Sequence, residues 1–221
     1  AFVILIIALA LLFDFLNGMN DAANSVATIV STRVLSPKLA VIWAATFNFI
    51  AAFFFGVHVA RTIGTGVIDA AIVSPVMILI SLLSAVAWTH VCTKGGLPIS
   101  VSHALIGGLI GSGVAKAGLG ALLVPGLLKI LLFIVLSPVV GFFLAMAIML
   151  ALFWLCRDAH PRKLDVWFRR LQLVSAGFYS LSHGTNDAQK TMGVVAVLLY
   201  STGYLGPEFY VPLWVILSCH F

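Results

Sequence analysis

The chain has 221 residues, of which 62% are hydrophobic and only 9% are charged, and its formal net charge is +5. A soluble domain carries about 25% charged residues, so this composition excludes a water-soluble globular protein and indicates that lipid is the main solvent. The basic residues lie in short segments between apolar runs, which is typical of membrane proteins and argues against a nucleic-acid partner.

Apolar runs divide the chain, and a helix that spans a bilayer takes about 20 residues. In chain order we expect membrane segments at residues 2–30, 39–59, 72–91, 127–156 and 171–200, with a last run after Pro212. Pro138 lies within the fourth run, where we favour one kinked helix over a tight hairpin. Both ends of the chain fall inside apolar runs, so we expect truncation at both ends. The predicted fold class is an all-α, polytopic helical membrane protein.

The stretch between the third and fourth runs differs from an ordinary span. A polar segment at residues 94–103 is followed by a short, glycine-rich apolar stretch that ends near Lys116. Short or interrupted apolar segments are typical of the discontinuous helices of transporters. We therefore expect a broken helix or half-helix here, and we expect the fold to contain broken or re-entrant helices.

The organisation that follows has three parts. We expect residues 1–156 to form a first membrane repeat, 157–170 a cytoplasmic loop and 171–221 the start of a second membrane repeat. If the chain starts outside and each segment crosses once, Arg33, Lys38, Lys94 and five basic residues of 157–170 lie inside, which agrees with the positive-inside rule. The three cysteines have no CxxC spacing and predict no structural metal site.

An internal repeat is the most informative feature of the sequence. The run Gly18-Met-Asn20-Asp21-Ala22 recurs as Gly184-Thr-Asn186-Asp187-Ala188, and both copies lie inside apolar segments. Matching interrupted segments in two halves of a membrane protein point to a transport site between inverted repeats. The glycine before each Asn-Asp pair predicts either a helix break or a close approach of another backbone.

Each copy lies on a polar stripe whose members are three, four and three residues apart. The stripes are Asp14, Asn17, Asp21 and Asn24 in the first copy, and Ser180, His183, Asp187 and Lys190 in the second. Residues three and four apart share one helix face, so each helix presents an apolar back to lipid and a polar front to the protein interior.

Ionised side chains at membrane depth cost roughly 2.5–3.5 kcal/mol each, so they are expected to serve a purpose. For Asp21 and Asp187 we favour a transport site over mutual pairing or helix–helix hydrogen bonds, and for Asp14 both interpretations stay open. Carboxylate and amide oxygens suit small hard cations, and carboxylates in apolar surroundings can take up a proton. We expect Asn20, Asp21, Asn24, Asn186 and Asp187 to handle a coupling ion or proton, supported by Asp14, Asn17, His183 and Lys190.

A second polar group precedes the glycine-rich stretch, at Pro98-Ile-Ser100-Val101-Ser102-His103. A serine before a helical run is an N-cap signal, and a helix N-terminus offers free N–H groups and a positive dipole end to an anion. An ordinary capped helix would explain this stretch by itself, but the Asn-Asp repeat favours the anion site. His103 is either a donor to the anion or a hydrogen-bonded buried histidine.

At these residues the sequence resembles the PiT family of inorganic phosphate transporters. The matching segments are residues 17–25, 96–103 and 182–190, together with the contexts of 31–33 and 136–141. The resemblance implies an inverted-repeat fold with phosphate at Ser100, Ser102 and the backbone of Val101, and the coupling cation at the two Asn-Asp pairs. It also implies a second Pro-x-Ser segment, which the sequence given does not reach.

The second copy of the motif departs from the pattern of sodium-coupled members. They resemble Asn-Asp-x-Ala-Asn in both repeats, whereas this chain has Lys190 at the last position of the second. The chain is similar in this to bacterial members, which implies proton-coupled transport of phosphate, either free or as neutral metal–phosphate. We expect a multi-pass protein of the bacterial inner membrane without cofactors, with sodium coupling as the alternative and homo-oligomer formation left open.

Two other functions compete with phosphate transport. Within the same fold, sulfate is the alternative anion. From another class, an intramembrane hydrolase would use Ser102, His103 or His183 with an aspartate, but no GxSxG or HExxH motif is present. Ser102 and His103 are sequence neighbours, which is poor geometry for a nucleophile and its base. We therefore expect a transporter with no catalytic residues.

Overall fold

The computed structural model describes residues 1–53 and 56–220 of the chain. The described residues form eight α-helices and three short 3-10 turns and no β-strand, so the predicted all-α fold is confirmed. The helices are α1 (Phe2–Ser31), α2 (Pro37–Ile50), α3 (His58–Thr65), α4 (Pro75–Lys94), α5 (Val101–Ala117), α6 (Val124–Cys156), α7 (Pro161–Ser201) and α8 (Leu213–His220). The turns are η1 (Ala51–Phe53), η2 (Ala70–Ile72) and η3 (Leu119–Ala121).

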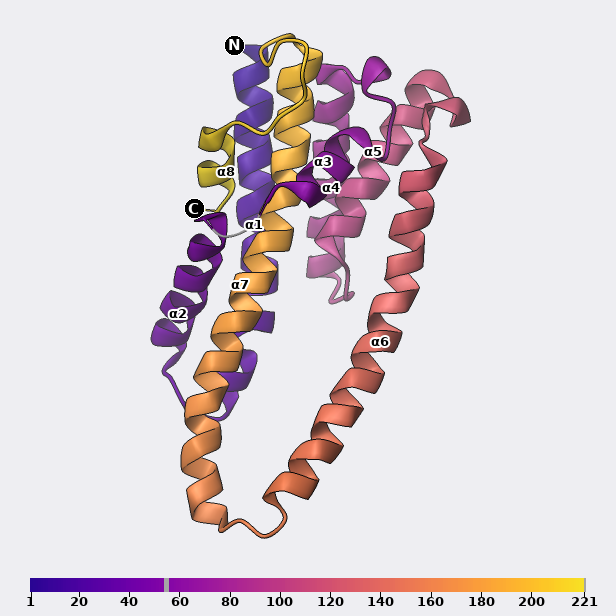
Figure 1. Ribbon diagram of the computed structural model, residues 1–221. Helices are drawn as coiled ribbons and strands as arrows, with labels where there is room; N and C mark the ends of the chain where they lie inside the picture. The colour runs from indigo at the N-terminus through magenta and orange to yellow at the C-terminus, as the bar shows by residue number, and fades with distance from the viewer. Residues whose placement is uncertain (54–55, 221) are drawn as a thin grey trace.

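Helices α1 and α7 lie side by side and run in opposite directions (Figure 1). Asn17 of α1 contacts Asp187 of α7, whereas Thr32, just after α1, contacts Gln172 nearer the start of α7. Proline, which is pre-organised for the first helical turn, begins α2, α4 and α7. The main hydrophobic core joins residues of α1, α3, α4, α5, α7 and α8 around this pair.

Neither of the two alternatives expected at the first motif, a helix break or a close approach of another backbone, occurs there. Helix α1 is continuous from Phe2 to Ser31, and a Cβ added at Gly18 would meet no atom within 4 Å. The prediction of close approach is confirmed at the second motif instead. A Cβ at Gly184 would lie 2.8 Å from the Cα atom of Asn48, so α2 packs directly on the backbone of α7 there.

The break occurs in the segment that the sequence suggested as an ordinary second span. Helix α2 with its 3-10 turn and helix α3 are inclined to each other by 78°. The side chain of Gln189 stabilises this arrangement, because its Oε1 accepts hydrogen bonds from the N–H groups of Val59 and Ala60 at the start of α3. Its Nε2 donates to the carbonyl of Gly56 at 2.7 Å.

Helices α4 and α5 form an antiparallel hairpin. Close packing is achieved at Gly108, where a Cβ would lie 2.5 Å from the carbonyl oxygen of Ser81. Thr93, near the tip of the hairpin, contacts Asn20, which lies eleven residues before the end of α1. The tip therefore lies beside the interior of the α1–α7 pair. A single crossing of each segment would place Lys94 on the same side as the basic residues of 157–170, and the structure does not place it with them. This placement supports the half-helix expected after Ser100.

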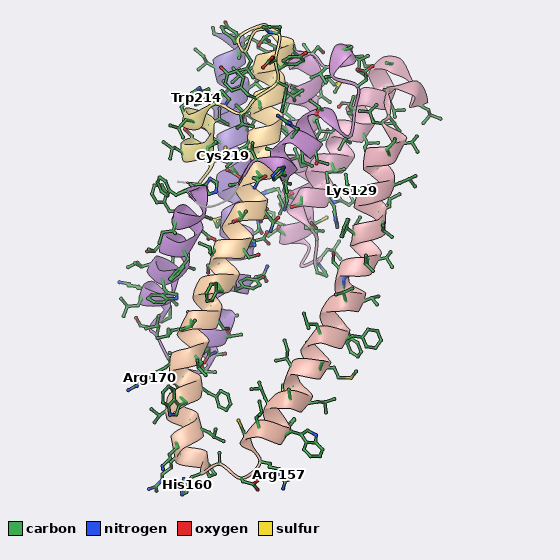
Figure 2. The ribbon with its side chains drawn as sticks, in the orientation of Figure 1. Lys129, Arg157, His160, Arg170, Trp214 and Cys219 are labelled. Atoms are coloured by element: carbon green, nitrogen blue, oxygen red, sulfur yellow. The ribbon has the colours of Figure 1, made fainter. Side chains whose placement is uncertain are left out.

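Helix α6 is a single helix that continues through Pro138, as predicted. None of its residues is buried, and it lies apart from α7 and converges on it only toward residues 157–160, where the two helices are joined (Figure 1). Arg157 and His160 lie at this meeting point and Arg170 lies farther along α7, all three far from Trp214 and Cys219 (Figure 2). The predicted loop at 157–170 is wrong for residues 161–170, which form the first turns of α7 after Pro161.

Three helices of the described residues, α1, α4 and α6, are long and apolar enough to cross a membrane. The bent α2–α3 pair makes a fourth if it is one broken span. Helix α7 has 41 residues, and its apolar part carries the second polar stripe. The architecture is that of a multi-pass membrane protein.

Candidate ion and anion site

The two aspartates of the repeated motif lie together between α1 and α7. One carboxylate oxygen each from Asp21 and Asp187 and a ring nitrogen of His183 lie within 4.8 Å of one another. The Nε2 atom of His183 is 3.3 Å from Asp187 Oδ2, and the His183 ring stacks on Tyr179 with an interplanar angle of 8°. We name Asp21, His183 and Asp187 the acidic cluster.

The stripe of α1 extends the acidic cluster toward the N-terminal end of the chain. Asn17 is buried and its Nδ2 donates to Asp187 Oδ2 at 3.2 Å. Asp14 accepts a 2.8 Å hydrogen bond from Thr191 Oγ1, one turn beyond Asp187 on α7. Both residues therefore tie α1 to α7, and the predicted polar front of each helix faces the protein interior at these positions.

Lys190 connects the acidic cluster to the hairpin. Its ammonium donates hydrogen bonds to Asp187 on its own helix and to Ser102 in the first turn of α5. An ammonium has three donors and no acceptor, so these two contacts leave one donor for a further oxygen. The carboxylate of Asp187 and the uncharged hydroxyl of Ser102 thus bind the same Lys190 ammonium.

The N-terminus of α5 has the capping geometry expected from the sequence. Ser100 Oγ accepts the N–H of His103 at 3.3 Å, which leaves the first N–H groups of the helix, at Val101 and Ser102, without intrahelical acceptors. The side chain of Val101 is buried, whereas Ser100 and His103 line a cavity of about 630 Å³ on the outer face of the hairpin. Ser102 points instead to Lys190, so the four predicted anion-site residues are divided between two faces of α5.

Three of the predicted coupling residues lie outside the acidic cluster. Asn24 is exposed and donates to Asp21 Oδ1 at 3.4 Å. Asn20 donates to the carbonyl of Leu16 and accepts from Thr93 Oγ1 of the hairpin. Asn186 is exposed and donates to the carbonyl of Ser182, so the structure does not bring it to Asp21.

Thr93, Gln189 and Thr191 were not among the residues predicted for the site. Thr93 donates to Asn20 and Thr191 donates to Asp14, both on α1, and Gln189 fixes the start of α3. Gln189 carried a usable signal, because a carboxamide in an apolar helix must find several hydrogen-bond partners. The threonines carried none, since a hydroxyl in a membrane helix commonly bonds to its own backbone.

The arrangement offers two kinds of chemistry at one place. Free N–H groups, a hydroxyl and an ammonium suit a small oxyanion at the N-terminus of α5. Two carboxylates and an imidazole suit a proton or one small cation, while the adjacent Lys190 ammonium opposes the entry of several cations.

The chain matches the family described as Phosphate transporter family at residues 17–167 and 156–221. It is 58% identical over 214 residues to the "Probable low-affinity inorganic phosphate transporter" of Rhizobium meliloti (strain 1021). That match covers 97% of this chain and 64% of the relative. It is 40% identical to the protein of the same name from Bacillus subtilis (strain 168), with 98% of this chain and 65% of the relative covered.

A solved structure of a sodium-dependent phosphate transporter has the same fold, with a TM-score of 0.81. The match covers 99% of this chain and 73% of that structure, at 24% sequence identity. The chain thus spans somewhat less than two thirds of the length of the two bacterial relatives. Those relatives point to the plasma membrane, and the family is one of transporters rather than enzymes, as expected. By sequence and by fold, the chain belongs to the phosphate transporter family.

Proposed function

We propose that this protein is a secondary transporter that moves inorganic phosphate across the membrane together with protons. The carrying observation is that Lys190 contacts Ser102 at the N-terminus of α5 and Asp187 in the acidic cluster. One side chain thereby touches the groups suited to an anion and the groups suited to a proton. The names of the bacterial relatives support phosphate as the substrate.

The anion is proposed to bind where α5 begins. The donors there are the backbone N–H groups of Val101 and Ser102, the hydroxyls of Ser100 and Ser102 and the ammonium of Lys190. Phosphate needs such donors, because its oxygens are acceptors and only one or two of them carry a proton. The positive end of the helix dipole adds to this attraction. His103, beside Ser100, can donate a further hydrogen bond from the cavity side.

The proton is proposed to bind in the acidic cluster. When Lys190 pairs with Asp187, the carboxylate is compensated and needs no proton. When phosphate takes the ammonium as its partner, Asp187 loses that compensation and binds a proton, because an unpaired carboxylate in apolar surroundings is costly. Anion and proton would then load together, which is the requirement of a symporter.

Sodium coupling is the alternative within the same site. The solved relative of the same fold is sodium-dependent. Asp21 and Asn24, whose side chains are joined by a 3.4 Å hydrogen bond, supply oxygens that suit sodium, and Asn20 is on the same helix. The matching position of the second repeat is occupied by Lys190, whose ammonium cannot ligate a cation. Two equivalent sodium sites are therefore excluded from the proposal, and one is retained as the alternative.

The remaining parts of the proposal concern organisation and substrate form. Residues 1–156 are proposed as a first repeat and 171–221 as the start of an inverted second repeat, with residues 157–170 on the cytoplasmic side. Sulfate is disfavoured because a carboxylate of the acidic cluster can accept a hydrogen bond from the P–OH group of hydrogen phosphate. Sulfate has no such proton at neutral pH. Neutral metal–phosphate remains a substrate form to be tested.

The test is phosphate uptake by the full-length transporter in proteoliposomes. An inward proton gradient in sodium-free buffer is expected to drive accumulation, and excess sulfate is expected not to compete. Uptake with and without magnesium separates free phosphate from metal–phosphate. Accumulation that requires sodium and ignores the proton gradient would establish the alternative, and competition by sulfate would overturn the choice of substrate.

A further inference from the structure

Helices α1, α2 and α7 meet in a seam that leads away from the acidic cluster. Asn17 contacts Asp187 and Thr32 contacts Gln172, so fifteen residues of α1 correspond to fifteen of α7. Helix α2 runs along the same stretch, because Trp43 Nε1 donates to the carbonyl of Leu173 and Asn48 packs against Gly184. Successive helical turns of the three helices therefore form layers.

The layer nearer to residues 157–160 is apolar. Ile29, Ala40 and Ala176 are buried there in one cluster, against which Trp43 and Leu173 pack. Ile29 and Ala40 are fully buried and Ala176 is 5% exposed, so these three side chains offer no polar group at this level. We name these three residues the apolar layer.

The next turn toward the acidic cluster has a different character. Each residue of the apolar layer has a counterpart four positions away on its own helix, and these counterparts are Ser25, Ala44 and Ser180. They are 3%, 6% and 0% exposed. Neither Ser25 Oγ nor Ser180 Oγ finds a hydrogen-bond partner among the described residues. We name Ser25, Ala44 and Ser180 the serine layer.

The two other buried serines of this protein do find partners. The hydroxyls of buried Ser81 and Ser112 form a 2.7 Å hydrogen bond with each other, and each also lies within hydrogen-bond distance of a carbonyl of its own helix. The hydroxyls of the serine layer do neither. One turn beyond them, Asn48 Oδ1 is also buried without a partner in the described part of the chain, at the level of Asp21 and Gly184.

Three buried oxygens without partners at one end of the acidic cluster require a ligand that can both donate and accept hydrogen bonds. A buried polar group without a partner costs about as much as a lost hydrogen bond, and ordered water commonly supplies the partner. A bare cation is a poor occupant, because this layer carries no negative charge.

We propose that the serine layer holds ordered water that connects the acidic cluster to the seam and carries protons between Asp21 and the end of the protein at residues 157–160. The apolar layer closes this path in the conformation described. This inference rests on the proton coupling proposed above. The ionisable groups near the carboxylates of Asp21 and Asp187 are His183 and Lys190 of α7 and Asp14 of α1. Helix α2 carries one ionisable group, Lys38, in its first turn.

The transport test fills the serine layer with methyl groups in the full-length protein. Ser25→Val and Ser180→Val, separately and together, are expected to slow proton-driven phosphate uptake about tenfold or more, since a positioned proton-transfer group contributes on the order of 10²-fold. Phosphate exchange at equal pH on both sides needs no net proton release, so it is expected to change far less. Ser31→Val is the matched control, because Ser31 is exposed on the same helix.

The hydration test uses silver ions, which are close to water in size and react with thiols. In a background with the three native cysteines replaced, Ser180→Cys is expected to make uptake silver-sensitive, and Ile29→Cys in the apolar layer is expected to be protected. The readout is the rate of loss of phosphate exchange, which does not depend on the driving ion.

The two tests separate the inference from the proposed function. Silver sensitivity at Ser180→Cys with uptake driven only by sodium would keep the water and overturn proton coupling, and with it the proton path. Proton-driven uptake that is unchanged in both valine variants, together with a silver-resistant Ser180→Cys, would overturn the water path and leave the proposed function standing. Equal silver reaction at Ile29→Cys and Ser180→Cys would overturn the closed apolar layer.

Discussion

The ammonium of Lys190 on α7 donates a hydrogen bond to the hydroxyl of Ser102 on α5, across 88 residues of sequence. The same ammonium pairs with Asp187, one turn away on its own helix. The hairpin and the second Asn-Asp motif are therefore joined through one charge. The variants below test what that connection does.

Replacing Lys190 tests the shared charge. Lys190→Met removes the ammonium but keeps a long apolar side chain, and is expected to raise the KM for phosphate about tenfold or more, because a hydrogen bond to a charged group contributes about 1.5–3 kcal/mol. Lys190→Asn reproduces the residue of the first repeat and is expected to introduce stimulation by sodium. Initial uptake rates with and without sodium measure both effects. An unchanged KM in Lys190→Met would remove the lysine from the anion site.

The two serines at the start of α5 are expected to hold the anion. In the double variant Ser100→Ala and Ser102→Ala, two hydroxyl donors are lost, each worth about 0.5–1.5 kcal/mol or more toward an anion. Phosphate uptake should fall by at least about tenfold at low phosphate, while the amount of protein in the membrane stays unchanged. Ser84→Ala, on the neighbouring helix and in the same outer cavity, is the control. Normal uptake kinetics in the double variant would contradict the assignment.

The two motif glycines are predicted to differ although their sequence contexts match. Gly184→Ala places a Cβ 2.8 Å from the Cα of Asn48 and 2.9 Å from its carbonyl oxygen, so α2 must move away from α7. Overpacking of this kind costs about 1–3 kcal/mol. Gly18→Ala meets open space and is expected to leave stability unchanged or slightly raised. Thermal unfolding in detergent, followed by fluorescence, compares the two. Equal melting temperatures would show that α2 does not pack on Gly184.

Gln189 is predicted to be a stability residue rather than a ligand. Gln189→Ala removes the acceptor of two α3 N–H groups and the donor to Gly56, and leaves buried polar groups that cost about 1–3 kcal/mol each. The expected result is a lower melting temperature, with phosphate affinity retained by the protein that remains folded. Gln172→Ala is the control, because the contact of Gln172 with Thr32 is exposed. A large loss of affinity without loss of stability would contradict this role.

Local pattern alone carried much of the fold and the identity of the site. Mean hydropathy of +1.17 and sparse charge require a membrane solvent. The three-four-three spacing around Asp21 and Asp187 fixes which side chains share a helix face, because that depends only on helical geometry. The cap at Ser100 was equally local, since it lies within one turn of its partner, His103.

Only the tertiary structure decided which of these groups meet. Gly18 and Gly184 have matching neighbours in sequence, yet only Gly184 is packed against another helix, because the contact depends on where α2 lies. The helix direction changes between α2 and α3. Gln189, about 130 residues away, supplies the hydrogen bonds at the start of α3. Asn186 and Asp187 are adjacent in the motif, but helical rotation turns Asn186 outward and Asp187 toward Asp21. Sequence spacing sets the face of each helix, whereas the position of the neighbouring helices decides which face becomes a site.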